Sequence, residues 1–450
     1  METVNALCAA VEKHRDLILE AERHIWKNPE TGYREVKTSK YLQERFEALG
    51  YELVPAGDIP GFYTVLDTGR PGPEILVLAE LDSLINSDHP DCDPETGAVH
   101  SCGHHAQCAA LLGLAAALKE PGVTDGMCGK IRLCAVPAEE LLEIEYRSRL
   151  RKKGIIHFYG GKQEFLRRGY FEGVDAAFMI HTTGGETFSA RDGAVGCIAM
   201  QVHYKGVSAH AGGAPQSGRN ALYAATLGLQ AINSIRETFQ EKDIIRVHPI
   251  ITKGGDAVNA IPSDVRIESY IRGKTFEAIA KASRRVNRAL TGAALSLGTN
   301  VEIIDLPGYG PMVTSKGMAD AAGDAMAECM PDREFKYSEG YGSGSTDMGD
   351  LSQVMPAIHA YAPGATGKSH GANYAIADPE LACVASAKWQ LAILQVLLRD
   401  GGKRTREICE GFTPAFPSQK AYVDYLESIC SEGDRIAYSE DETSARVTLD

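Results

Sequence analysis

The sequence predicts an α/β protein in which a larger domain with a mostly parallel central sheet is interrupted by a smaller α+β domain. Before Gly196, short apolar runs alternate with helical stretches rich in Ala and Leu, which is typical of a parallel sheet and its crossover helices. After Gly196, polar and apolar residues alternate as they do in antiparallel strands. A chain of 450 residues also exceeds the usual size of one hydrophobic core.

The N-terminal part of the chain carries two expected helices, at about 4–27 and 35–49, and then three expected buried strands. Each strand is followed by acidic residues or by histidine: Glu80 and Asp82 after 75–79, Glu139 and Glu140 after 131–136, and His181 after 176–180. The carboxyl ends of parallel strands share one edge of a sheet, where sites are usually found. We therefore expect a functional site at that edge.

The second domain is expected at 197–308, and the catalytic domain at 1–196 and 309–450. Within the inserted domain, two segments with strand-like alternation, 197–210 and 246–273, are each followed by a helical stretch. After the return, the sequence predicts a helix at 315–330, a strand at 356–364 and a last core helix at 381–400. The acidic tail after Gly401 receives no role.

Composition excludes some partners. Sixty acidic residues against 46 basic ones give a net charge of −14, which argues against nucleic acid or an anionic membrane as the main partner. We expect neither a secretory signal nor a membrane span, because the first residues are charged and no uncharged apolar stretch is long enough. Eleven scattered cysteines fit free thiols in a reducing cytoplasm.

The stretch HSCGHH places Cys102 and His104 just before an Ala/Leu helix. A helix N-terminus favours a thiolate, and thiolate with imidazole suits zinc and its first-row neighbours. Taken alone, this spacing is better explained by a buried cysteine beside a surface histidine. The neighbouring Glu139 and Glu140 strengthen the metal hypothesis, because one carboxylate can bind metal while the other takes a proton from water. Taken alone, they are also explained as an exposed strand end.

Two Gly-rich loops near the end of the chain add His370, in GATGKSHGANY, and Asp347, in GYGSGSTDMGD. Glycines permit a close approach of the backbone to a site. The alternative for each is a flexible surface loop.

Eight features occur in a fixed order: HSCGHH, PAEE, the strand-end His181, GVSAHAGGAP, GGDAVNAIP, YIRG, GSTDMGD and SHGANY. In this the chain resembles the dinuclear metallopeptidase and amidohydrolase family of aminoacylases, glutamate carboxypeptidases and auxin-conjugate hydrolases. It looks most like the p-aminobenzoyl-glutamate hydrolase branch, which is similar to the β-alanyl dipeptidases. The resemblance covers about 17–398. It implies a zinc-peptidase-like catalytic domain, with the insert acting as a lid and dimerisation domain.

The resemblance implies two divalent metal ions per chain, which could be zinc, manganese, cobalt or nickel. The implied ligands are Cys102 as the bridge, with His104, Glu140, His181 and His370. Glu139 would be the general base, and Asp82 would orient an imidazole ligand. His105 stands where the family has Asp or Asn, and could be a hydrogen-bond donor behind the ligands or a spare ligand.

The insert would contribute to the site of a homodimer. His210 would reach across the dimer to polarise the scissile carbonyl, while Asn259 and Arg272 would bind the free carboxylate of the substrate. Without the resemblance, all three could be ordinary exposed strand residues. The segment 141–161 is longer and more charged than the family pattern, so it is either a solvated helix face or the rim of a pocket for an acidic or unusual substrate.

The favoured function is hydrolysis of an amide bond next to a free carboxylate, by attack of a metal-bound hydroxide. The substrate would be a small molecule: an N-acyl amino acid, an aminobenzoyl-glutamate-type conjugate or a dipeptide. The alternatives are an inactive metal-containing binding or partner protein, and a hydrolase that uses Cys102 as nucleophile.

Overall fold

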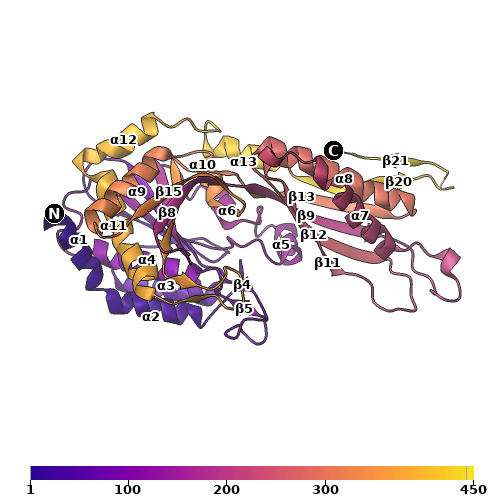
Figure 1. Cartoon of the computed structure of the whole chain (residues 1–450), viewed down its shortest axis with the longest axis horizontal. Helices are drawn as coiled ribbons and strands as arrows, with labels where there is room; N and C mark the ends of the chain where they lie inside the picture. Colours follow the sequence, from indigo (N-terminus) through magenta and orange to yellow (C-terminus); the bar gives the residue numbers. More distant parts are fainter. Residues whose placement is uncertain (1, 442, 450) are drawn as a thin grey trace. The chain divides into compact units, whose positions relative to one another are not determined.

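A computed structural model describes residues 2–441 and 443–449, and these form two compact units (Figure 1). The first unit comprises the residues up to 193, 312–342 and 347–423; the second comprises 194–311, 343–346 and the described residues from 424 onward. The tail was expected in the catalytic domain, and this is wrong for the part after 423. The physical reason is a tail strand that pairs with the sheet of the second unit.

The first unit contains a nine-stranded sheet in the order β1-β2-β6-β3-β7-β16-β8-β14, with β15 beside β8. Its strands are β1 Val54–Pro55, β2 Phe62–Asp67, β3 Glu74–Glu80, β6 Lys130–Val136, β7 Ala176–Thr183, β8 Phe188–Ala194, β14 Met312–Val313, β15 Phe335–Gly342 and β16 Ala357–Pro363. The central strands β6, β3, β7 and β16 run parallel, whereas β1 and β2 pair antiparallel. The predicted α/β class with a mostly parallel central sheet is confirmed.

Helices surround this sheet. They are α1 Glu2–Glu12, α2 Arg15–Trp26, α3 Val36–Ala48, α4 His104–Leu118, α5 Ile144–Lys152, α6 Gly161–Arg167, α9 Lys316–Cys329, α10 Met348–Ser352, α11 Ser386–Leu398 and α12 Lys403–Glu410, while α13 Gln419–Ser428 runs from the first unit into the second. Two short hairpins pair β4 Leu84–Ile85 with β5 Ala98–Val99, and β17 Ala365–Thr366 with β18 Ala375–Ile376.

The single N-terminal helix expected at 4–27 is two helices. The break lies at His14, whose φ of −104° and ψ of 15° are not helical. Here the Lys13 ammonium and the His14 imidazole both bind the Glu120 carboxylate, at 2.8 and 2.9 Å.

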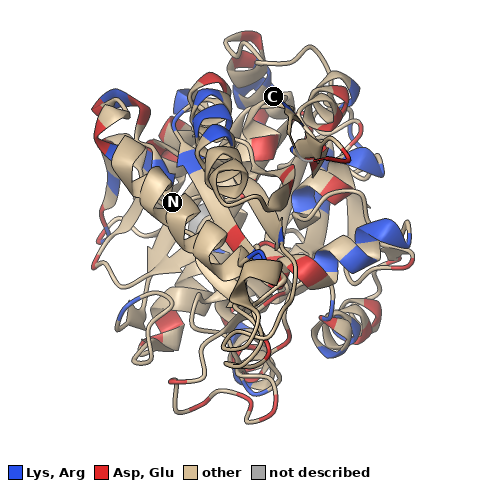
Figure 2. Ribbon diagram, turned by 90° about the vertical axis from the view of Figure 1, so that its right-hand side faces the viewer, with Lys and Arg blue, Asp and Glu red and all other residues tan. Residues whose placement is uncertain are grey.

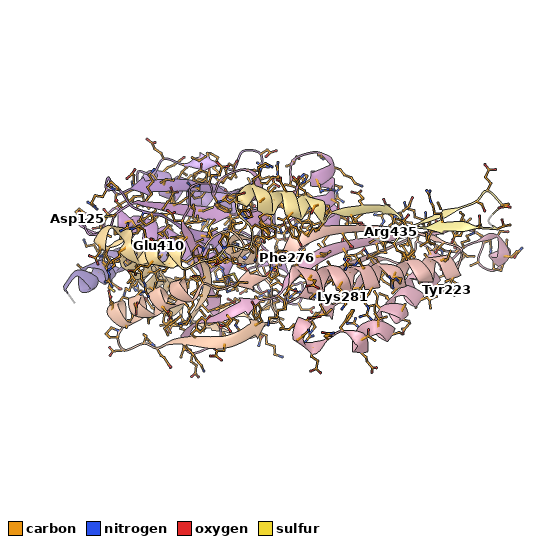
Figure 3. All side chains as sticks on the ribbon, turned by 90° about the horizontal axis from the view of Figure 1, so that it is seen from above. Asp125, Tyr223, Phe276, Lys281, Glu410 and Arg435 are labelled. Carbon is orange, nitrogen blue, oxygen red and sulfur yellow. The ribbon has the colours of Figure 1, made fainter. Side chains whose placement is uncertain are left out.

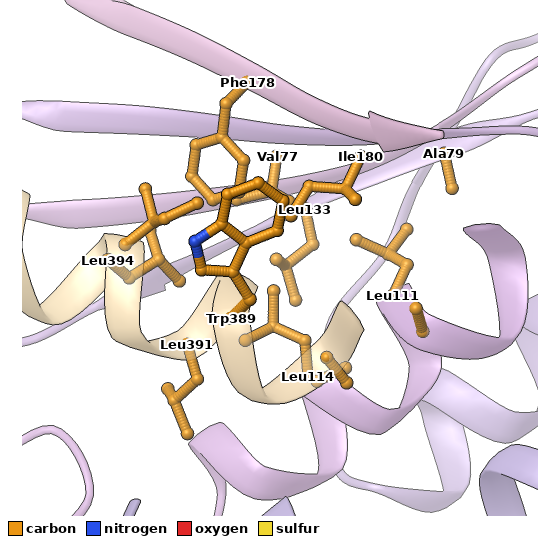
Figure 4. Close-up of a cluster of buried hydrophobic side chains, with 14 of the residues drawn as sticks. Val77, Ala79, Leu111, Leu114, Leu133, Phe178, Ile180, Trp389, Leu391 and Leu394 are labelled. Carbon is orange, nitrogen blue, oxygen red and sulfur yellow. The ribbon is translucent and has the colours of Figure 1, made fainter. Parts of the chain in front are cut away.

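The core of the first unit is centred on α4 and α11. Figure 4 shows Trp389 of α11 among the side chains of Phe178, Leu133 and Leu394. Trp389 is fully buried, and its indole N–H donates to the carbonyl of Ala322 at 2.9 Å. The helical stretch Glu380–Leu398, which begins with a π-helical turn, is apolar and long enough to cross a bilayer, contrary to expectation. It is 83% buried inside the protein, which is typical of a core helix.

The second unit contains a six-stranded sheet in the order β10-β12-β9-β13-β19, with β11 also paired to β12. Its strands are β9 Gly196–Lys205, β10 Arg246–Val247, β11 Ile250–Lys253, β12 Asp264–Gly273, β13 Asn300–Tyr309 and the tail strand β19 Ser431–Asp434. All five strand pairs are antiparallel. Helices α7 Ala221–Ile235 and α8 Phe276–Ser296 pack on this sheet, and β20 Ile436–Tyr438 pairs with β21 Ala445–Val447 in a hairpin.

The surface carries charges of both signs. In the view of Figure 2, Lys and Arg occur close to Asp and Glu on many of the same helices and loops. Such mixing is typical of the surface of a globular protein.

Close packing of α2 against α4 predicts a contrast between two helical glycines. A Cβ added at Gly113 of α4 would lie 2.4 Å from Cδ1 of the fully buried Ile18, whereas one added at Gly292 of α8 would meet nothing within 4 Å. We expect Gly113→Ala to destabilise by roughly 1–3 kcal/mol through overpacking, and Gly292→Ala to stabilise by roughly 0.5–1 kcal/mol. Urea unfolding followed by circular dichroism measures both. An equal gain in stability for the two variants would contradict this packing.

Candidate metal centre

The carboxyl ends of three parallel strands bring the predicted residues together. β3 pairs with β6 on one side and with β7 on the other, so the residues that follow β3 and β6 lie at the same edge of the sheet as His181 near the end of β7. The turn before α4 packs against this edge. Gly103 has a φ of 104°, and a Cβ there would lie 2.1 Å from Oγ1 of Thr182 and 2.3 Å from the hydroxyl of Tyr374. Only glycine fits, and its neighbours Cys102 and His104 are thereby placed beside β7.

Two sets of candidate ligands share one sulfur atom. The ligand atoms of Cys102, His104 and His181 all lie within 4.8 Å of one another, and so do those of Cys102, Glu140 and His370. Within the sets, Sγ of Cys102 is 3.4 Å from Nε2 of His181, and Nε2 of His370 is 3.0 Å from Oε1 of Glu140. Two ligand sets with a common thiolate can hold two cations with that thiolate between them.

The hydrogen bonds of His104 show which ring nitrogen faces this centre. Nδ1 lies 2.9 Å from the carbonyl oxygen of Asp82 and 3.2 Å from its carboxylate. Nε2 is buried and makes no hydrogen bond to any described residue, although Oε2 of Glu80 lies 3.2 Å away. The other carboxylate oxygen of Asp82 accepts from the N–H of Glu140 at 2.8 Å. Asp82 therefore orients two candidate ligands, and the unsatisfied Nε2 is suited to a metal ion.

The environment of Cys102 favours the thiolate. Burial opposes ionisation, but the imidazoles of His104 and His181 lower the pKa of this thiol to about 6. A thiolate is the form of cysteine that binds metal.

Glu139 belongs to neither set that contains Cys102. It is 7% exposed, and burial together with the negative charges of Glu80 and Glu140 raises the pKa of its carboxyl well above the ordinary value. The preceding Ala138 has a φ of 57°, unusual for a residue with a side chain, and its N–H donates to the buried Glu35 carboxylate at 2.7 Å. A buried carboxyl beside a metal centre is suited to proton transfer.

A third group, Glu80 with His104 and Glu139, also has ligand atoms within 4.8 Å. The carboxylate of Glu80 is already engaged, because it accepts from the Lys162 ammonium at 2.6 Å and from the Gln107 amide at 2.9 Å. We therefore favour the two sets built on Cys102.

Lys162 is a residue near the centre that the sequence did not predict. Lys162 is fully buried, and its ammonium contacts both Glu80 and Asp347. Its backbone N–H also donates to the Asp347 carboxylate at 3.0 Å. Asp347 and Glu80 were noticed only for their places in a loop and at a strand end. Glu80 directly follows an apolar run, which is a usable signal, whereas a lone lysine after two glycines carries none.

His105 lies behind the centre and belongs to none of the three groups found among the described residues. Its Nε2 is 3.3 Å from the Glu22 carboxylate, and its ring packs against Trp26 and His100. Burial lowers its pKa.

The structure places His210, Asn259 and Arg272 in the second unit, whereas the candidate ligands are in the first. His210 and Asn259 are exposed neighbours: His210 forms a β-bridge with Ala260, and the N–H of Ala211 donates to the carbonyl of Asn259 at 2.9 Å. Arg272 lies on β12 opposite Cys197 of β9.

The basic segment 141–161 contains α5. The expectation of a solvated helix face fits Lys152 and Lys153, which are exposed. It is wrong for Arg147, which is 1% exposed. The guanidinium of Arg147 donates to the carbonyl of Tyr159 at 2.8 Å and to the carbonyl of Glu140. This arginine therefore fixes the backbone at a candidate ligand.

The sequence matches the model of peptidase family M20/M25/M40 over residues 77–394, so the chain belongs to this family. It is 29% identical over 302 residues to one of the p-aminobenzoyl-glutamate hydrolase subunits from Escherichia coli K12, covering 65% of this chain and 58% of that protein. It is 30% identical over 263 residues to the indole-3-acetyl-aspartic acid hydrolase of Enterobacter agglomerans, covering 55% of each chain. The chain thus matches little more than half the length of these two relatives.

A solved structure shows the same fold. A dinuclear metal-binding peptidase of the M20 family from Bacillus subtilis aligns with a TM-score of 0.62 and 19% identity, over 86% of this chain and 99% of that one. The zinc-peptidase-like fold expected from the sequence motifs is confirmed.

Substitution of the shared sulfur tests the ligand sets. Cys102→Ser replaces a bridging thiolate with a hydroxyl, a poor ligand for soft cations, so we expect metal content to fall from about two ions per chain to one or fewer. Plasma mass spectrometry of the zinc-loaded protein measures this. Cys108→Ser is the matched control: it lies further along α4 and donates to the Glu80 carbonyl, which a hydroxyl also can do. Unchanged loading of Cys102→Ser would remove this residue from the centre.

Proposed function

We propose that this chain is a metal-dependent hydrolase that cleaves an amide bond next to a free carboxylate. One observation carries the proposal: two ligand sets share the sulfur of Cys102, and the buried carboxyl of Glu139 lies next to them. The two relatives are named for p-aminobenzoyl-glutamate and indole-3-acetyl-aspartate, amides in which the amino-acid part keeps free carboxylates. An N-acyl amino acid, an aminobenzoyl-glutamate-type conjugate or a dipeptide shares this feature.

Cys102, His104, His181, Glu140 and His370 would hold two divalent cations. Thiolate and imidazole favour zinc, cobalt or nickel over magnesium and calcium, and the Glu140 carboxylate also suits manganese. Bound cations of this kind lower the pKa of water and polarise a carbonyl group.

Glu139 is the proposed proton carrier. Its carboxylate would take a proton from the attacking water and return it to the leaving nitrogen as the C–N bond breaks. The raised pKa of this carboxyl suits both steps, because such a group binds a proton more readily than an ordinary glutamate.

The second unit would complete the site. His210 would polarise the scissile carbonyl from the partner subunit of a homodimer, and Asn259 and Arg272 would bind the carboxylate of the substrate. Nδ1 of His210 accepts from the N–H groups of Gly212 and Gly213 at 3.2 and 2.9 Å, which leaves the proton on Nε2. A protonated Nε2 is the form needed to donate to an oxyanion.

An exposed apolar surface on the second unit supports the homodimer. Tyr223 and Leu227 on α7 are 65% and 41% exposed, and Ile250 and Ile251 on β11 are 62% and 40% exposed. Among the described strands, β11 pairs only with β12, so its other edge is open. An open strand edge beside apolar side chains is suited to pairing with a second copy.

We place the enzyme in the cytoplasm. All eleven cysteines are free thiols in the structure, and several are partly exposed, which fits a reducing compartment.

A hydrolase with a cysteine nucleophile is the second candidate. Sγ of Cys102 lies 3.4 Å from an imidazole nitrogen, and the pKa of the Cys102 thiol is lowered to about 6. Chelation separates the two functions. A metal-dependent hydrolase loses turnover with chelator and regains it with zinc or manganese, whereas a cysteine hydrolase keeps its turnover.

Removal of the proposed proton carrier tests the mechanism. We expect Glu139→Gln to lower kcat by roughly 10²–10⁴-fold, because the amide cannot take a proton, while the metal content stays near two per chain. Turnover of p-aminobenzoyl-glutamate and elemental analysis are measured on one preparation. The control is Glu172→Gln, an exposed glutamate of the same unit. Loss of metal along with activity would make Glu139 a ligand instead.

A charge at the open edge tests the dimer. Ile250→Asp places a carboxylate where a second copy would pack, so we expect the mass from light scattering to halve. The control is Val313→Asp, because Val313 is an exposed apolar residue of the first unit. Ile244 would not serve as a control, because its backbone is left-handed. If the wild-type protein is already a monomer, His210 loses its proposed role.

A further inference from the structure

The second unit contains a cavity of about 540 Å³. It is bounded by one face of α8, by ends of β9 and β13, and by the tail from Tyr425 to Glu432. All lining residues belong to the second unit, whereas the candidate ligands are in the first. Figure 3 labels Phe276, which begins α8 and lines the cavity.

The C-terminal tail builds one wall of this cavity. β19 pairs with β13 from Glu302↔Asp434 to Asp305↔Ser431, and Tyr425 packs edge-on against Phe276 with ring centroids 5.1 Å apart. The tail was the segment to which the sequence analysis assigned no role. The walls combine the aromatic rings of Phe276 and Tyr425 with several polar side chains, and a cavity of this size is typical of a small-molecule site.

The polar end of the cavity has an unused acceptor. The carboxylate of Asp305 accepts from the hydroxyl of Ser283 at 2.8 Å and from the amide N–H of Asn287 at 2.7 Å. All three residues are less than 7% exposed. The amide oxygen of Asn287 is buried and accepts no hydrogen bond from any described residue. A buried acceptor of this kind costs free energy unless a donor reaches it, and a ligand or water in the cavity would supply that donor.

A positive charge lies one helical turn away. Arg284 also lines the cavity, and it precedes Asn287 by three residues on α8, so the two side chains are neighbours on the helix surface. In the part of the chain that the structure describes, Arg284 makes no ion pair. A guanidinium binds a carboxylate with two parallel hydrogen bonds.

We propose that this cavity binds a free α-amino acid with an aromatic side chain. The ammonium group would donate to the amide oxygen of Asn287 beside the negative charge of Asp305, and the carboxylate would bind Arg284. The side chain would pack against Phe276 and Tyr425.

The proposed function gives this site a use. Hydrolysis of an amide next to a free carboxylate releases an amino acid, so the cavity would sense a product of the same reaction class. This last step rests on the proposed function, whereas amino-acid binding does not.

The test is calorimetric titration of the metal-loaded full chain with L-phenylalanine. We expect Arg284→Gln to raise Kd by about tenfold or more, as for loss of a charge-assisted pair. Arg288→Gln, one turn further along α8 and outside the cavity lining, should leave Kd unchanged. Phenylpropionate, which lacks the ammonium, and phenethylamine, which lacks the carboxylate, should both bind more weakly than phenylalanine.

Equal Kd values for Arg284→Gln and the wild-type protein would overturn the proposal, as would phenylpropionate binding as tightly as phenylalanine. Hydrogen exchange gives a second readout: bound phenylalanine should slow exchange of the β19 amides, since the tail forms a wall. Binding without any change in β19 would place the ligand elsewhere and also overturn it. Amide hydrolysis measured on the same samples shows separately whether the proposed function holds.

Discussion

The Sγ atom of Cys102 belongs to both ligand sets, and the left-handed turn at Gly103 fixes its position. Any side chain at residue 103 would overlap Thr182 and Tyr374, so the turn lies directly against the end of β7, where His181 is. The hydroxyl of Tyr374 donates to the carbonyl of Cys102 at 3.2 Å.

The loop that carries His370 is tied to the same turn. The backbone N–H of His370 donates to the carbonyl of Ser101 at 2.9 Å, and the backbone of His370 is left-handed with a φ of 63°. One glycine thus governs where ligands from three distant segments meet, and the cost of the unusual backbone at His370 is offset by these contacts.

Two adjacent glutamates receive opposite environments at this centre. Burial opposes ionisation of Glu140, but its bond to His370 lowers the pKa to about 2. Burial and nearby carboxylates raise the pKa of Glu139 instead. Environments that separate the pKa values of two neighbouring acids assign them different roles. The buried ammonium of Lys162 makes this separation of pKa values possible. Without it, Glu80 and Asp347 would add two uncompensated carboxylates to the centre.

Much of this could be predicted from sequence, because strand ends carry a local signal. The apolar runs before Glu80, Glu140 and His181 are local patterns, and parallel pairing then requires that their ends meet. Lys162, Glu35 and the inward turn of Arg147 could not be predicted, because each depends on which partner lies across the fold. The tail strand was missed for the same reason: β19 is short and polar, with Ser, Glu, Gly and Asp, and only the edge of β13 makes it a strand.

X-ray absorption at the zinc edge of the zinc-loaded protein tests the central claim most directly, because it detects the sulfur that the two sets share. With two ions per chain, the account predicts one sulfur neighbour per zinc at about 2.3 Å, with nitrogen and oxygen filling the remaining positions. It also predicts a zinc–zinc distance of roughly 3.5–4 Å. Two bound zinc ions surrounded only by nitrogen and oxygen would contradict a centre built on Cys102.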